Sequence, residues 1–180
     1  MTLQHLPNAI SIARLLLVVP VTLWLLDGQY EPALWLFVVA GCSDALDGFF
    51  ARRFGWQTRV GALLDPAADK VLLVAAFFTI GWLGLVPWWL VWTVFARDVI
   101  IVALYWHRRV PVSAEPTTIS KLNTFAQTGC VVLVVYDAAF GANRVLIDSW
   151  IAVTLLTTVF SGLLYLGLWV RRETQLRSAA

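Results

Sequence analysis

Six long apolar runs dominate the sequence and leave little chain outside them. They cover residues 10–26, 32–51, 61–83, 87–106, 120–140 and 146–170. A helix needs about 20 apolar residues to cross the hydrocarbon core of a bilayer, and each run is close to that length. The composition agrees, because 60% of the 180 residues are hydrophobic and 13% are charged. We therefore predict an all-α integral membrane protein with six transmembrane helices and a single domain over residues 1–180.

The positive charges between the runs predict the orientation in the membrane. Arginines occupy positions 52, 53 and 59 after the second run, 108 and 109 after the fourth, and 171, 172 and 177 after the sixth. The alternate connections contain only Arg144. Because basic residues gather on the cytoplasmic side, we expect both termini to face the cytoplasm. The net charge of +2 is too small to indicate a nucleic-acid partner and fits an anionic lipid surface.

Four aspartates interrupt the second and third apolar runs, at Asp44, Asp47, Asp65 and Asp69. Asp44 lies eight residues before Arg52, and Asp69 lies eight residues after Gly61. At a rise of about 1.5 Å per residue, both are roughly 12 Å below the predicted cytoplasmic boundary. Spacings of three and four residues put each pair on one helix face, and the short connection allows the two faces to meet.

Four carboxylates at this depth would repel one another and would each cost several kcal/mol to desolvate, on the order of what other buried ions cost. Protonation or binding of divalent cations would relieve that cost. Oxygen ligands without His or Cys favour Mg²⁺, Mn²⁺ or Ca²⁺ over zinc, and a two-metal site would suit a diphosphate ligand. The residues alone leave two other interpretations open, namely ion pairs with arginines and the ion pathway of a small cation transporter.

The aspartates belong to a longer motif, Asp44-x2-Asp47-Gly48-x2-Ala51-Arg52-x8-Gly61-x3-Asp65-x3-Asp69. It resembles, at every position, the motif of the CDP-alcohol phosphotransferases, which are membrane enzymes of phospholipid synthesis. The resemblance implies a six-helix homodimer that uses two divalent ions, Mg²⁺ or Mn²⁺, to bind a CDP-linked donor such as CDP-diacylglycerol. An acceptor hydroxyl then expels CMP. It also implies that all four aspartates are metal ligands and that Asp69 is the catalytic base.

A second element of the resemblance precedes the first apolar run. Asn8-x2-Ser11-x2-Arg14 is similar to an Asn-x2-Thr-x2-Arg element of the same family. With the longer motif, it implies a set of donor-binding residues, which are Asn8, Arg14, Gly48, Ala51, Arg52 and Gly61. Taken by itself, Arg14 could equally extend to the membrane interface and keep its charge in water.

Polar residues within the fourth and fifth runs mark a candidate acceptor site. Arg97 and Lys121 would hold the phosphate of an anionic acceptor, and Asn123 and Gln127 would donate or accept hydrogen bonds. Such groups inside a membrane need partners or a water-filled cavity.

The surrounding sequences, FARDV and PTTISKLNTFAQ, are similar to those of the CDP-dependent cardiolipin synthases of mitochondrial type. This likeness implies phosphatidylglycerol as the acceptor. The alternative is glycerol 3-phosphate, the acceptor of phosphatidylglycerophosphate synthases. We expect a bacterial inner-membrane enzyme whose active site lies between helices and faces the cytoplasm.

Overall fold

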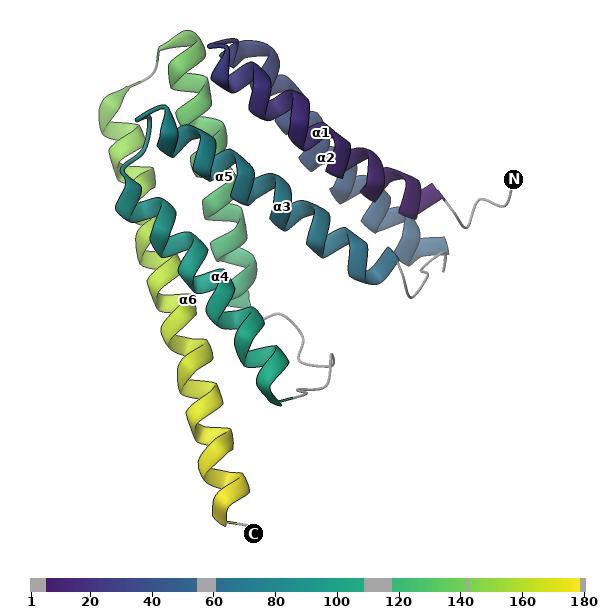
Figure 1. Cartoon of the computed structure of the whole chain (residues 1–180), viewed down its shortest axis with the longest axis vertical. Coiled ribbons are helices and arrows are strands. Elements are labelled where there is room, and N and C mark those ends of the chain that lie inside the picture. The colour runs from purple at the N-terminus through teal and green to yellow at the C-terminus, as the bar shows by residue number, and fades with distance from the viewer. Residues whose placement is uncertain (1–5, 55–60, 109–117, 142, 179–180) are drawn as a thin grey trace. The chain divides into compact units, whose positions relative to one another are not determined.

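The computed structural model describes residues 6–54, 61–108, 118–141 and 143–178, and within them the chain forms six helices and no strand (Figure 1). The helices are α1 (Leu6–Leu26), α2 (Tyr30–Phe54), α3 (Gly61–Trp82), α4 (Trp88–Arg108), α5 (Thr118–Phe140) and α6 (Arg144–Ser178). Each predicted run is a helix, so the all-helical fold class is confirmed. The largest difference is at α6, which continues to Ser178 instead of ending near Val170.

Three connections depend on glycines in the left-handed region of the Ramachandran plot. Gly28, Gly84 and Gly141 have φ values of 75°, 71° and 75°, which a residue with a Cβ adopts only with strain. After α1, the N–H of Gln29 donates to the carbonyl of Trp24 at 2.8 Å, and the N–H of Gly28 donates to Leu25 at 3.1 Å. These two bonds form a Schellman motif, which satisfies carbonyls at the helix end.

The helices gather into two compact units. Unit 1 comprises Met1–Val86 and Val131–Asn143, so it contains α1, α2, α3 and the second half of α5. Unit 2 comprises Pro87–Cys130 and Arg144–Ala180, so it contains α4, the first half of α5, and α6.

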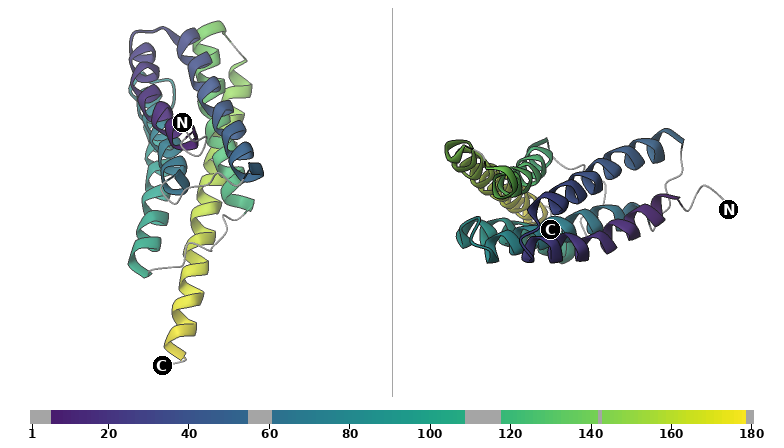
Figure 2. Two further views of the ribbon diagram at one scale, coloured as in Figure 1. Left: turned by 90° about the vertical axis from the view of Figure 1, so that its right-hand side faces the viewer. Right: turned by 90° about the horizontal axis from the view of Figure 1, so that it is seen from above.

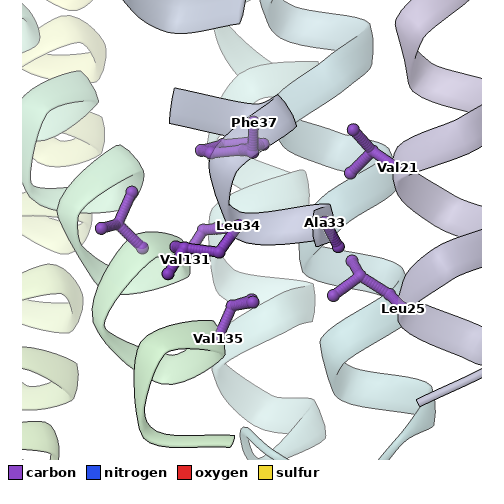
Figure 3. Close-up of a pocket in the computed structure, with 8 residues that line it drawn as sticks. Val21, Leu25, Ala33, Leu34, Phe37, Val131 and Val135 are labelled. Carbon is purple, nitrogen blue, oxygen red and sulfur yellow. The ribbon is translucent and has the colours of Figure 1, made fainter. Parts of the chain in front are cut away.

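In unit 1, α1 packs against both α2 and α3, as the views in Figures 1 and 2 agree. Apolar side chains fill the contact, and they include Val21, Leu25, Ala33, Leu34, Phe37, Ala76, Phe77 and Ile80. A small hollow in the described part of unit 1 is lined only by aliphatic and aromatic side chains of α1, α2 and α5 (Figure 3). It holds about 10 Å³, roughly the space of one water molecule, so it is a packing defect and not a substrate pocket.

Helix α6 of unit 2 buries polar side chains and exposes apolar ones. Thr154, Thr158 and Ser161 have no exposed surface, whereas Leu156 and Phe160 are 68% and 59% exposed. A helix of a water-soluble protein shows the opposite arrangement. The inversion is what lipid requires, because hydrocarbon solvates apolar side chains and polar groups must find partners inside the protein.

Two of the described helical segments, Thr118–Phe140 and Arg144–Val170, are long and apolar enough to cross a membrane. A third apolar segment, Ile12–Leu26, is shorter. Two of the six expected spans are thus candidate spans by length and composition, and six crossings remain a prediction.

The contact of α5 with α6 depends on a glycine. The Trp150 indole N–H donates to the carbonyl of Ala126 at 3.0 Å, and the ring lies over Gly129. A Cβ at Gly129 would lie 2.8 Å from Cζ2 and 2.9 Å from Nε1 of Trp150. Because Trp150 cannot retreat without losing its hydrogen bond, only glycine fits at this position.

We expect Gly129→Ala to destabilise the folded protein by about 1–3 kcal/mol, the usual cost of overpacking. Gly41→Ala in α2 is the matched control, because a Cβ there meets nothing within 4 Å and alanine favours the helix. The measurement is the temperature at which each variant in detergent loses its monodisperse elution peak. Equal midpoints for the two variants would contradict the packing argument.

Candidate functional site

The helix segments that carry the four aspartates point toward the same end of unit 1. Asp44 and Asp47 lie in the last three turns of α2, and Asp65 and Asp69 lie in the first three turns of α3. Helix α2 ends and α3 begins at the same end of the unit, where α1 also begins (Figure 1). The backbone therefore carries all four positions toward one end of unit 1.

Most of the predicted donor site lies outside the described side chains. This applies to Asp44, Asp47 and Asp65, and to Asn8, Gly48, Ala51, Arg52 and Gly61. The structure places their backbones in α1, α2 and α3, and their roles stay predictions.

Two predicted site residues do meet. The Arg14 guanidinium donates from Nη1 to Oδ1 of Asp69 at 2.5 Å. Arg14 lies eight residues after the start of α1, and Asp69 lies eight residues after the start of α3. Because these helices pack together and begin at the same end, the two side chains lie at matching heights. Arg14 is 2% exposed, so it does not extend to the membrane interface.

The two side chains of the Arg14–Asp69 pair differ in their exposure to solvent. The Arg14 side chain is 2% exposed, whereas the Asp69 side chain is 43% exposed. Charge-assisted hydrogen bonds of this kind are short and directional. The guanidinium therefore fixes the orientation of the carboxylate while much of its surface remains accessible from outside the helices.

Among the described side chains, no group of three His, Cys, Asp or Glu residues lies close enough to hold a metal ion. Of the four predicted ligands, Asp69 is the one whose side chain is described. The chemistry of the four predicted ligands can still be compared with what a divalent ion prefers. Helical backbone runs through all four positions, and at spacings of three and four residues the two positions of each pair belong to one helix face. The set supplies carboxylate oxygens, which are the ligands that Mg²⁺ and Mn²⁺ prefer. The residues therefore fit such an ion.

Arg97 is the centre of the polar contacts in unit 2. It is 6% exposed and donates from Nη1 to Asp98 Oδ1 at 2.9 Å. Its Nη2 donates to the hydroxyls of Ser120 at 3.0 Å and Ser161 at 2.6 Å. The guanidinium also lies 5.8 Å from the centre of the Tyr165 ring, within range of a cation–π interaction. Arg97 of α4 thus binds both α5 and α6.

Asn123 and Gln127 also face the interior of unit 2, and both are fully buried. The Thr158 hydroxyl donates to Asn123 Oδ1 at 2.8 Å. Gln127 Nε2 is 3.5 Å from the same hydroxyl, which is the limit of a hydrogen bond. Lys121, by contrast, is exposed. The four residues predicted for the acceptor thus divide into three interior groups and one outward-facing cation.

The sequence interpretation did not include the partners on α6. Thr154, Thr158, Ser161 and Tyr165 recur every three or four residues within the sixth apolar run. That spacing puts them on one helix face. Polar residues on one face of a membrane helix would have been sufficient to suggest a buried contact.

The comparison with known families is decisive at this point. A model of the family described as CDP-alcohol phosphatidyltransferase matches residues 4–169. The chain belongs to the CDP-alcohol phosphatidyltransferase family. The match includes the aspartate positions of α2 and α3, Arg14 of α1, and the polar residues of α4 and α5. Membership confirms the resemblance that the aspartate motif indicated.

Relatives within the family carry two different names. Rat "Cardiolipin synthase (CMP-forming)" is 33% identical over 117 residues, which cover 64% of this chain and 39% of the rat protein. A rice chloroplast "CDP-diacylglycerol–glycerol-3-phosphate 3-phosphatidyltransferase 1" is 32% identical over 195 residues, which cover 93% of this chain and 59% of the rice protein. The chain thus spans less than two thirds of the length of each of these two relatives.

A Mycobacterium tuberculosis protein named "Probable phosphatidylglycerophosphate synthase" is 32% identical over 187 residues, which cover 99% of this chain and 88% of the relative. Identities of 32% and 33% do not separate the two activities. The comparisons identify this phosphatidyltransferase by family and leave the acceptor to be argued from its residues.

Proposed function

We propose that this chain transfers a phosphatidyl group from CDP-diacylglycerol to an alcohol and releases CMP. The observation that carries the proposal is the Arg14–Asp69 pair, at the end of unit 1 toward which the helices of the other three aspartate positions also run. An acidic site with one oriented, accessible carboxylate suits proton removal from a hydroxyl beside a bound diphosphate. In this proposal, residues 1–180 act as one domain.

The proposed chemistry assigns a role to each part of this site. Asp44, Asp47, Asp65 and Asp69 would hold two divalent ions, Mg²⁺ or Mn²⁺. When bound, such ions neutralise the diphosphate and stabilise the departing CMP phosphate. Asp69 accepts the proton of the acceptor hydroxyl, whose oxygen forms a bond to the β-phosphorus of the donor. The bond between that phosphorus and the oxygen of CMP breaks, and CMP leaves with its electron pair.

Other residues of unit 1 would bind the donor and orient the base. Arg14 holds one oxygen of Asp69, which keeps the carboxylate aimed while its other surface is accessible. Asn8 and Arg52 would contact the phosphates or cytidine. Gly48, Ala51 and Gly61 would leave space for the nucleotide to approach the helix backbone.

We propose phosphatidylglycerol as the acceptor and cardiolipin as the product. The support is the sequence around Arg97, Lys121, Asn123 and Gln127, which is similar to that of cardiolipin synthases, together with the rat relative of that name. The second candidate is glycerol 3-phosphate, favoured by the mycobacterial relative that aligns with 99% of this chain.

The proposed setting is a bacterial inner membrane. The chain would cross it six times as a homodimer, with both termini and the active site on the cytoplasmic side. The positive charges of alternate connections support this orientation, and the mycobacterial relative supports a bacterial source.

The test supplies purified protein in detergent with CDP-diacylglycerol and Mg²⁺ or Mn²⁺. One reaction contains phosphatidylglycerol and the other contains glycerol 3-phosphate, and mass spectrometry identifies the lipid products. We expect cardiolipin and CMP in the first reaction only. Phosphatidylglycerophosphate in the second reaction only would keep the transferase and replace the acceptor. Cation flux into proteoliposomes without CMP release would instead indicate a transporter.

A further inference from the structure

Arg14 belongs to the buried face of α1, together with Val21 and Leu25. All three side chains are buried, and spacings of seven and eleven residues put them on one side of the helix. Helix α1 packs against α2 and α3 in unit 1. The guanidinium is therefore held inside the unit, and it cannot move into water without pulling the arginine stem out of this packed face.

Asp69 meets the guanidinium from a helix that is fixed by its own packing. Ala68, Leu72 and Leu73 are neighbours of Asp69 on α3, and all three are buried. The backbone under the carboxylate is therefore held in place whether or not Arg14 is present. An aspartate side chain has few torsion angles left to order, so the hydrogen bond from Arg14 contributes only modestly to its orientation.

The charge of Asp69 is already matched by that of Arg14. Nη1 of the guanidinium is 2.5 Å from Oδ1, while the Asp69 side chain is 43% exposed. A divalent ion that binds the exposed part of the carboxylate must share it with the guanidinium, and the two cations repel each other. Arg14 stays beside them, because a buried charge that loses its partner is strongly destabilising.

We infer that Arg14 weakens the binding of divalent ions to Asp69, so that a guanidinium buried in unit 1 sets the metal affinity of the proposed site. This inference rests on the proposed function and gives Arg14 a role besides orienting the base. A neutral partner that orients a ligand strengthens metal binding, and its loss weakens binding by about 10–100-fold. A cationic partner adds repulsion, which acts in the opposite direction. Repulsion is the larger effect here, because the packing of α3 already holds Asp69.

The test titrates Mn²⁺ into the full-length protein in detergent and measures the free ion by electron paramagnetic resonance, without turnover. Arg14→Gln should bind Mn²⁺ about tenfold more tightly than the wild type, because one positive charge beside a ligand is removed. Arg14→Lys keeps the charge, so its dissociation constant should stay within about threefold of the wild-type value. Arg144→Gln is the control for total charge, because Arg144 is exposed at the start of α6, and it should not change the affinity.

The direction of the change separates repulsion from a structural role. A site that has lost its shape binds the ion more weakly, so an unchanged or weaker affinity in Arg14→Gln would overturn the inference. The gain should also disappear when Arg14→Gln is combined with Asp69→Asn, because the shared carboxylate is then gone. An equal gain with and without Asp69→Asn would indicate a general effect of charge and would contradict the role of Asp69.

Arg14→Met is the second variant if Arg14→Gln does not fold, because methionine keeps an unbranched apolar stem in the buried face of α1. If either variant folds only when Mn²⁺ is present, the ion replaces Arg14 as the partner of Asp69, as the inference predicts. Failure of both variants to fold with Mn²⁺ present would make Arg14 a structural residue and overturn the inference. Absence of saturable Mn²⁺ binding and of CMP release in the wild-type protein would instead refute the proposed function.

Discussion

Asp69→Asn is expected to lower the rate of CMP release by roughly 10²–10⁴-fold, the usual contribution of a general base. Asparagine has nearly the same shape as aspartate, and its carbonyl oxygen still accepts a hydrogen bond from Arg14. It cannot accept a proton from the acceptor hydroxyl. The hydrogen bond with Arg14 is therefore largely kept, whereas the capacity to accept the proton of the acceptor hydroxyl is lost.

The loss should appear in kcat, and the affinity for the donor should remain close to that of the wild type. Equilibrium binding of CDP-diacylglycerol to the detergent-solubilised variant measures this directly. Asp148→Asn is the matched control, because Asp148 is exposed on α6 and makes the same change of charge. Retention of more than half of the wild-type turnover by Asp69→Asn would assign the base to another residue.

The helices and their ends were predictable because their causes are local. Each apolar run became a helix, and glycines at positions 28, 84 and 141 end three of them with positive φ. Both signals depend on neighbouring residues only. The extension of α6 to Ser178 was not predicted, because we used hydropathy to end the helix, and a helix can continue into water where apolarity stops.

The contacts within each unit were less predictable, because they join residues far apart in the chain. Arg14 and Asp69 are 55 positions apart, and Arg97 and Ser161 are 64 apart. The sequence singled out Arg14, Asp69 and Arg97 as candidate site residues, but it did not identify their partners and did not include Ser161. Arg97 shows the consequence, since its charge suggested a ligand for phosphate whereas its burial and its four contacts indicate a structural tie.

For the four aspartates, the sequence alone predicted a shared face and depth, and the structure shows that all four positions lie in helices. The spacing of carboxylates does not specify which ion they bind or whether a hydroxyl approaches Asp69. These steps depend on the chemistry of the family motif and require direct measurement.

Removal of divalent ions should abolish CMP release. Dialysis against a chelator, followed by stepwise addition of Mg²⁺ or Mn²⁺, should restore the rate along a saturable curve. The reason is electrostatic, because a bound diphosphate beside four carboxylates would be strongly repelled without cations between them. Full activity in the presence of the chelator would exclude the proposed metal site.

Substitution of single ligands should separate metal binding from proton transfer. Asp44→Asn and Asp65→Asn each remove one negative charge from the predicted metal ligands and retain the predicted base, Asp69. Each variant should therefore need about 10–100-fold more Mn²⁺ to reach half of its maximal rate, which is the usual effect of losing a partner at a metal site. Electron paramagnetic resonance of free Mn²⁺ reports the binding without reference to turnover. Asp27→Asn is the control, because Asp27 is exposed in the turn after α1 and the substitution removes the same charge.

If Asp44→Asn bound Mn²⁺ as the wild type does, Asp44 would lie outside the metal site. If Asp69→Asn bound Mn²⁺ normally yet released no CMP, the carboxylate that Arg14 orients would act on the proton of the acceptor and not only on the ion.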